Sequence, residues 1–397
     1  MTTAGTGAPI AAQDRITELD ALRGFALLGV FIVHFVGLLH YEVVADEQVR
    51  ETWMAAPYNR WFVFASDWLF ENKANTLFAT LFGFGFWIQM TRLEGRGAAF
   101  QTVYLRRLTV LLTIGLINWI FVFPGDVLHE YALLGFVLFL CRRLPERSML
   151  LIGIVLALAV QPILETLFAE IGLSGDIWDD KMAAAQSVES YSEWVSLTFP
   201  AQLMRDIALF GFVPWGLYLL GRFFFGAWAA RQDVIGAARR NRRLTNKATL
   251  GAMAIGLVFE YVSLRIFLGT IDAPDWLDML LHALGAPILA LSYAGAVVLV
   301  CHSARLGWIA RLLSPVGRTA LTSYVAHGAL LSLLIWPFGL DLRDAISPLG
   351  GFLIATGFFG LMTLASHFWL QRYRFGPLEW LWRGATYGEM PALRHSA

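Results

Sequence analysis

The chain has 397 residues, of which 57% are hydrophobic and only 15% are charged. Soluble proteins carry about a quarter charged residues, so this composition argues against a soluble enzyme. Basic and acidic residues number 30 each, so no overall basic field points to a nucleic-acid partner. The two cysteines, Cys141 and Cys301, lack the spacing of a metal site or a disulfide framework, and we expect no bound metal.

Repeated long apolar stretches predict an all-α, polytopic helical membrane protein with about ten transmembrane helices, because helices satisfy their own backbone in lipid. The third and fourth spans are short and separated by a Phe-Pro-Gly-Asp turn, which predicts a tight helical hairpin. We expect a single membrane domain over 1–397, with amino-terminal helices in 15–170 and carboxy-terminal helices in 200–397. The expected spans are 20–41, 72–90, 108–123, 127–141, 148–168, 204–228, 248–268, 280–301, 319–337 and 350–370.

The connections between these spans alternate in charge. Basic connections such as "CRRLPERS" and "RQDVIGAARRNRR" alternate with acidic ones such as "EVVADEQ" and "IDAPDWLD". Because lysine and arginine favour the cytoplasmic side, both termini are expected in the cytoplasm. The stretches 42–71 and 174–200 are rich in aromatic residues, which indicates that they lie along or dip into the outer membrane interface.

The first span, "RITELDALRGFALLGVFIVHF", carries ionisable groups at both ends. Arg15 and Arg23 lie at its cytoplasmic mouth, and His34 follows eleven residues after Arg23, roughly 16 Å deeper. The arginines also fit the positive-inside rule, with Asp20 as a helix cap or ion-pair partner. An ionisable group as deep as His34 is costly and usually faces a polar pathway, although a hydrogen-bonded structural histidine is the alternative.

The fourth span opens with "GDVLHEYALLG", which brings Asp126, His129 and Glu130 onto one helical side. A carboxylate beside an imidazole can orient and tune a general base. The alternative is an amino-terminal cap, with Asp126 favoured by the helix dipole.

Two further spans carry polar groups. Lys73 begins the second span and either snorkels to the interface or faces a substrate, while Gly83 and Gly85 permit close helix packing in the same span. His327 lies about halfway through the ninth span, in "LTSYVAHG", where the polar residues Ser323 and Tyr324 precede it. A polar stripe facing the bundle interior is therefore expected there.

Several segments together resemble a known family. They are "LDALRGFALLGV", "KANTLFATLFGFGF", "GDVLHEYALLG", "GRTALTSYVAHG" and "FGPLEWLWRGATYG", and they resemble the YeiB-like bacterial membrane proteins that carry the domain of unknown function DUF418. The "GPLEWLWR" block is the most specific of them. The first span also resembles the opening of the acyltransferase-3 family and of the heparan-glucosaminide acetyltransferase family. The resemblance implies a shared fold of about ten helices in the bacterial cytoplasmic membrane.

By this resemblance Arg15 and Arg23 match the cytoplasmic arginines of the acyltransferase-3 pattern, and His34 matches its essential histidine. The sequence departs from the YeiB-like pattern at His34, where asparagine is frequent, and at His327, where glutamine is usual. The first departure brings the chain closer to the acyltransferases.

The leading hypothesis is transfer of an acyl group from cytoplasmic acyl-CoA to a small-molecule, glycan or lipid acceptor at the outer side of the membrane. Arginine suits the phosphates of the donor, and a deep base would activate the acceptor. The competing hypotheses are a transporter or exporter of a small metabolite or lipid, and a non-catalytic membrane partner or sensor. The oligomeric state stays open. The residues expected in the site are His34, Asp126 and His129 for catalysis, Arg15 and Arg23 for the donor, and Lys73 and His327 for the substrate.

Overall fold

The computed structural model describes residues 16–38, 47–95, 100–160, 163–164, 184–207 and 212–395. Within these ranges the fold is helical, apart from one isolated bridge between Tyr373 and Arg394, so the all-α prediction is confirmed. The helices are α1 (Thr17–Val33) with the π-helical turn η2 (His34–Leu38), α3 (Glu47–Ala55), α4 (Pro57–Leu69), α5 (Lys73–Gly95), α6 (Phe100–Phe121), α7 (Leu128–Leu140), η3 (Cys141–Arg143), α8 (Glu146–Val155) with the π-helical turn η4 (Leu156–Val160), α11 (Tyr191–Ile207), α12 (Phe212–Arg231), α13 (Val234–Arg240), α14 (Arg242–Phe267), α15 (Asp275–Cys301), α16 (Gly307–Arg318), α17 (Ala320–Ile335), α18 (Pro348–Arg372) and α19 (Pro377–Tyr387).

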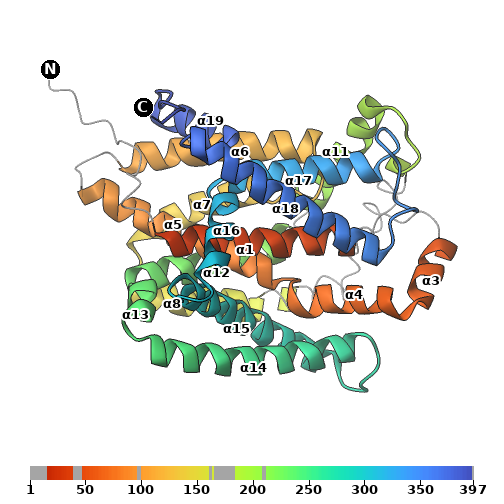
Figure 1. Cartoon of the computed structure of the whole chain (residues 1–397), viewed down its shortest axis with the longest axis horizontal. Helices are drawn as coiled ribbons and strands as arrows, with labels where there is room; N and C mark the ends of the chain where they lie inside the picture. Colours follow the sequence, from red (N-terminus) through yellow and green to blue (C-terminus); the bar gives the residue numbers. More distant parts are fainter. Residues whose placement is uncertain are drawn as a thin grey trace.

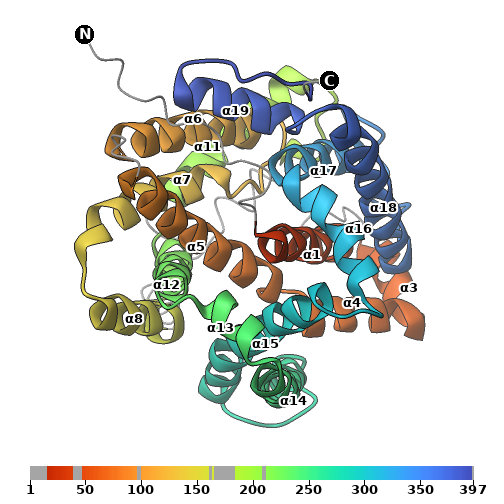
Figure 2. The same ribbon diagram turned by 60° about the vertical axis from the view of Figure 1, so that its left-hand side comes forward.

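Most of the long helices run along one axis of the molecule, with α1 in the interior (Figures 1 and 2). α1 contacts α5, α15, α16, α17 and α18, and α12 packs against α5, α7 and α8. Glycines allow the closest approaches: a Cβ on Gly24 would lie 2.2 Å from the backbone oxygen of Leu313 in α16. The expected hairpin of the third and fourth spans is present as α6 packed against α7.

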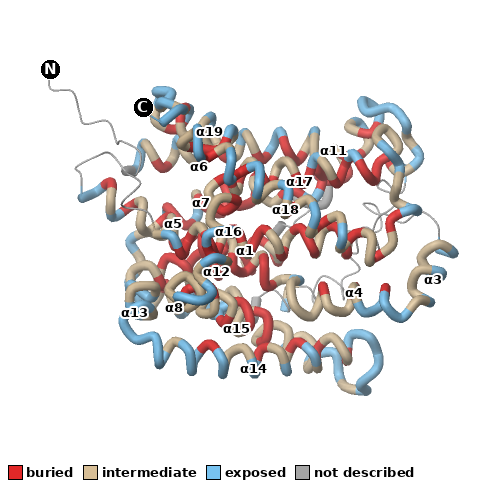
Figure 3. The backbone as a smooth tube through the Cα atoms, in the orientation of Figure 1, coloured by how far each residue is buried: buried red, intermediate tan, exposed pale blue. Residues whose placement is uncertain are grey.

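Five of the described helices are long and apolar enough to cross a membrane: 17–37, 101–121, 242–267, 275–301 and 348–372. α14 also exposes large apolar side chains, including Leu250, Val258 and Phe267, and much of its length is coloured as exposed in Figure 3. Exposed apolar surface of this extent is typical of a helix that faces lipid. Each of the ten expected spans overlaps a helix, while the count of ten and the side of the termini stay predictions.

The stretch before the second span, which its aromatic content predicts to lie along the outer interface or dip into it, includes the helices α3 and α4. α4 and α5 follow each other along the bundle, separated only by the turn Phe70–Asn72 (Figure 1). Asn72 adopts a φ of 58°, a left-handed conformation that asparagine tolerates better than most residues. α4 packs against α14, α18 and η2 and buries Val63, whereas Tyr58 and Trp61 are exposed. The result is a helix that is interrupted inside the bundle.

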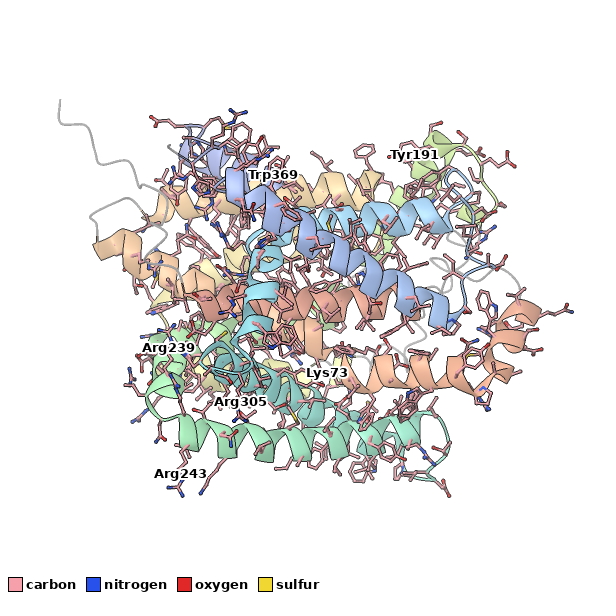
Figure 4. The ribbon with its side chains drawn as sticks, viewed as in Figure 1. Lys73, Tyr191, Arg239, Arg243, Arg305 and Trp369 are labelled. Carbon is pink, nitrogen blue, oxygen red and sulfur yellow. The ribbon has the colours of Figure 1, made fainter. Side chains whose placement is uncertain are left out.

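Several arginine side chains mark one end of the bundle. Arg239, Arg243 and Arg305 lie at one end, here called the basic end (Figure 4), and α3 and the α14–α15 turn lie at the opposite end (Figure 1). At the basic end the buried Glu18 accepts hydrogen bonds from Arg239 Nε and Nη2, both at 2.6 Å, and lies 2.7 Å from His302 Nε2. The Glu18 carboxylate raises the pKa of Arg239. These contacts join α13, α1 and α15.

Candidate functional site

A cavity of about 1220 Å³ extends through the bundle, and residues of α1 line it along much of the helix. Asp20 and Arg23 line it towards the basic end, and His34 lines it further along the same helix. Phe267 and Met279, near the α14–α15 turn, line it towards the opposite end. The first helix therefore presents its arginine and its histidine to one continuous space.

Five guanidinium groups from five different helices line the basic end of this cavity. Arg23 is 2.8 Å from Asp20, and the Arg107 guanidinium lies 3.9 Å from the centre of the Trp382 ring. The backbone of Arg107 is held as well, because Trp382 Nε1 donates to its carbonyl oxygen at 3.0 Å. Such a cluster can bind a polyanion through charge-assisted hydrogen bonds. The five residues are Arg23, Arg92, Arg107, Arg318 and Arg383.

Only Arg23 of this cluster was expected from the sequence. The predicted donor residue Arg15 lies outside the described residues. The other four arginines lie in segments whose positive charge the positive-inside rule already explained, so the pattern did not separate them from solvated residues. Arg383 ends the "GPLEWLWR" block, the most family-specific segment of the sequence. Its place in that block was the one sequence feature that could have singled it out.

The same block fastens α19 to α17. The Glu379 carboxylate accepts hydrogen bonds from Leu321 N at 2.7 Å, from Thr322 N at 3.1 Å and from Thr322 Oγ1 at 2.6 Å, which caps the first turn of α17. A Cβ at Gly376 would lie 2.1 Å from Glu379 Oε2, so only glycine leaves room for this cap. Burial raises the pKa of Glu379. The cap therefore fixes the position of α19, the helix from which Arg383 reaches the cavity.

His34 and His327, both of which the sequence singled out, are in direct contact. His34 Nδ1 lies 2.7 Å from His327 Nε2, and His327 Nδ1 lies 2.7 Å from the carbonyl oxygen of Tyr324. A carbonyl only accepts, so His327 Nδ1 carries a proton, and in the neutral ring Nε2 accepts. His34 Nδ1 therefore donates to it, which leaves the lone pair of His34 on Nε2. No described residue hydrogen-bonds this nitrogen.

The surroundings hold this pair in place. His327 is fully buried and stacks on Phe31 with ring centres 4.7 Å apart, while His34 lines the cavity at the start of the π-helical turn η2. Turns of this kind often occur at functional sites. Of the two histidines, only His34 lines the cavity and can accept a proton from a molecule bound there. His327 orients the His34 ring.

The residues at the start of α7 divide between two roles. Asp126 lines the cavity, but its carboxylate also accepts from Leu128 N at 3.0 Å and from Asn118 Nδ2 at 2.8 Å, as the capping alternative predicts. His129 is 3.3 Å from Asp126, is stacked on Trp119, and is absent from the cavity lining. These contacts favour a structural role for His129. Glu130 does line the cavity, and its carboxylate accepts from Trp215 at 2.9 Å.

Lys73 neither snorkels nor lines the cavity. It is fully buried near the middle of the molecule (Figure 4), where Nζ donates to the carbonyl oxygen of Asp67 at 2.8 Å and pairs with Glu260. Its charge therefore lies at the carboxyl end of α4, where the helix dipole favours a cation. His282 Nδ1 is 3.2 Å from the same Glu260 oxygen. Glu260 and His282 line the cavity, and sequence reasoning singled out neither.

Comparison with known proteins finds relatives over almost the whole chain. The family model described as "Protein of unknown function (DUF418)" matches residues 229–389. "Uncharacterized protein YxaH" of Bacillus subtilis is 28% identical, and an "Uncharacterized 39.9 kDa protein in amylase 3'region" of Bacillus acidopullulyticus is 30% identical, each alignment covering 96% of both chains. "Uncharacterized protein YeiB" of Escherichia coli is 26% identical over 94% of this chain and 97% of its own.

Proposed function

Because this chain belongs to the YeiB-like family of DUF418 proteins, whose names state no activity, we propose its function from the cavity itself. We propose a membrane acyltransferase that takes an acyl group from acyl-CoA at the basic end and passes it to an acceptor entering from the opposite end. In this proposal the chain crosses the bacterial cytoplasmic membrane about ten times, and the basic end faces the cytoplasm.

The donor half of the proposal is supported by the five arginines at the basic end of the cavity. Coenzyme A carries several phosphates at one end and its thioester at the end of a long flexible arm. Guanidinium groups would hold the phosphates, and the arm would extend along α1. Arg23 and His34 are eleven residues apart on this helix, a rise of about 16 Å, so the charged group and the reacting carbon would occupy separate parts of one cavity.

The observation that carries the proposal is the chain from the Tyr324 carbonyl through His327 to His34. It leaves His34 Nε2 able to take the proton of an acceptor hydroxyl or amine. The acceptor atom would bond to the thioester carbonyl carbon, the carbon–sulfur bond would break, and the coenzyme A thiolate would leave. His327 Nε2 would hold the imidazolium of His34 in place by accepting the hydrogen bond from its Nδ1–H.

The test is turnover of acetyl-CoA by protein in lipid nanodiscs, followed as thiol release with a panel of hydroxyl and amine acceptors. We expect His34→Gln to abolish acceptor-dependent release and His327→Gln to reduce it, while the exposed His367 serves as the control through His367→Gln. A deleted general base costs about 10²–10⁴-fold in rate. Full activity in a folded His34→Gln protein would refute the role of His34.

One observation favours a transporter as the second candidate. The interruption between α4 and α5 lies inside the bundle beside the cavity, and interrupted helices form the substrate sites of many transporters. Uptake or export of labelled substrate by proteoliposomes, without consumption of acyl-CoA, would favour this candidate. We expect instead that acyl-CoA is consumed.

A further inference from the structure

The cavity has a second polar region, separate from the arginines and from the histidine pair. Four carboxylates line it around the α4–α5 interruption and the facing parts of α14 and α15: Asp67, Glu71, Glu260 and Asp278. The lysine and arginine side chains that line the cavity are all in the arginine cluster at the basic end. The charge of the cavity wall therefore changes sign along its length. We call these four residues the acidic wall.

The acidic wall is under-neutralised. Lys73 and His282 both approach Glu260 Oε2, whereas no described residue hydrogen-bonds Glu260 Oε1, although Glu260 is only 3% exposed. A buried carboxylate oxygen without a donor is costly, and a native structure rarely leaves one so. Asp278 accepts a hydrogen bond from Ser263 Oγ, whereas no described residue hydrogen-bonds the carboxylate of Asp67, which is half-buried, or that of Glu71, which is exposed. The wall thus holds more negative charge than the described side chains around it neutralise, and it has an unused buried acceptor at Glu260 Oε1.

We infer that the acidic wall is a binding site for the ammonium group of an organic amine. An ammonium group supplies three hydrogen-bond donors and one positive charge, which are the two properties that the wall lacks. A compact metal ion fits less well, because no three histidine, cysteine, aspartate or glutamate side chains among the described residues converge closely enough to hold one. Apolar residues of the same segments also line the cavity, such as Phe70 and Leu264, and they suit the hydrocarbon part of an amine.

This inference deepens the proposed function, and only its chemical consequence rests on that function. An acceptor amine held by the acidic wall would lie in the same cavity as His34. The ammonium group would leave one proton on a carboxylate of the acidic wall, and the amine nitrogen would then bond to the thioester carbon while the carbon–sulfur bond breaks. His34 Nε2 would take a second proton from this nitrogen and pass it to the coenzyme A thiolate, so the products would be an amide and coenzyme A thiol, with one proton left on the wall. Binding of the amine itself needs no acyl donor.

The experiment measures binding to detergent-purified full-length protein by titration calorimetry in the absence of acyl-CoA. The probe is 1,5-diaminopentane, with 1,5-pentanediol as an uncharged molecule of the same length. We expect saturable binding of the diamine and none of the diol. Asp67→Asn/Glu71→Gln should weaken binding about tenfold or more, the loss expected for a charge-assisted contact. Asp272→Asn, an exposed acid near the α14–α15 turn, should leave it unchanged.

Glu260→Gln should also weaken binding, but it leaves the buried Lys73 without its counter-charge, so the double variant is the principal test. The same titration in nanodiscs distinguishes the source of the amine. Competition by phosphatidylethanolamine, but not by phosphatidylglycerol, would identify the natural ligand as a lipid amine. If neither lipid competes, the natural ligand is a soluble amine. Equal binding of diol and diamine, or undiminished binding by the double variant, would overturn the inference. Intact amine binding in a protein that does not bind acyl-CoA would overturn the proposed function alone.

Discussion

The ion pair between Lys73 and Glu260 gives a quantitative prediction about the interrupted helix. Lys73 is fully buried and Glu260 is 3% exposed, so neither charge is well solvated if its partner is removed. Removing one member of a buried pair costs about 3–5 kcal/mol. Lys73→Met also removes the hydrogen bond to the Asp67 carbonyl, worth about 1 kcal/mol. His282 Nδ1 remains 3.2 Å from the Glu260 carboxylate and offsets part of this cost, so we expect a loss of about 3 kcal/mol.

Glu260→Leu alone should cost about as much, because it leaves a buried ammonium group with only a carbonyl partner. Lys73→Met/Glu260→Leu leaves no charge, and we expect it to lose no more than about 1 kcal/mol relative to the original chain, since apolar replacement of a buried pair is often neutral. The double variant should therefore be more stable than either single one.

The assay is reversible unfolding in mixed micelles with increasing SDS, followed by circular dichroism. Arg50→Met is the control, because the Arg50–Glu47 pair is solvent-exposed and such pairs contribute about 0–1 kcal/mol. If the effects of Lys73→Met and Glu260→Leu simply add in the double variant, the two residues are not coupled. The placement of Lys73 against Glu260 would then be wrong.

Two further predictions concern packing and the α17 cap. Gly83→Ala should destabilise the fold by about 1–3 kcal/mol, because a Cβ there would lie 1.9 Å from the Phe223 carbonyl oxygen, whereas at Gly85 the nearest atom is 4.0 Å away; equal melting temperatures for Gly83→Ala and Gly85→Ala would contradict this packing. The raised pKa of Glu379 means that the folded state holds the Glu379 proton more tightly than the unfolded state does. The contribution of Glu379 to stability is therefore greatest below the ordinary glutamate pKa of 4.5, and it is lost as pH rises through the raised pKa. The melting temperature of the original chain relative to Glu379→Gln should therefore fall as pH rises above about 4.5, with the exposed Glu389→Gln as control, and a constant difference across pH would refute the shift.

Much of the fold follows from hydropathy because lipid-facing and buried helices are both apolar. The spans, the α6–α7 hairpin and the resemblance to the YeiB-like proteins all came from long apolar stretches and short sequence blocks. The interruption at Phe70–Asn72 could not be predicted in this way, since it contains neither glycine nor proline. Its signal was Asn72, a residue that tolerates positive φ, next to a lysine at the start of an apolar span.

The candidate site was only partly predictable. Depth in the membrane singled out His34, and the structure adds His327 as its hydrogen-bond partner. Glu260 went unnoticed in "GLVFEYVSL" although an ionisable residue within a span is itself a functional signal. The four additional arginines were hidden for another reason: a positive charge at a cytoplasmic helix end is expected whether or not it faces a cavity, and only the three-dimensional arrangement separates the two cases.

The most direct test of the acyltransferase proposal is binding of acetyl-CoA to the detergent-purified protein by titration calorimetry. Arg383 lines the cavity, whereas Arg243 is exposed at the same end (Figure 4) and does not line it. We predict saturable binding that is about tenfold or more weaker in Arg383→Gln and unchanged in Arg243→Gln. No binding by the folded original chain, or an equal loss in both variants, would contradict a donor site at the arginine cluster.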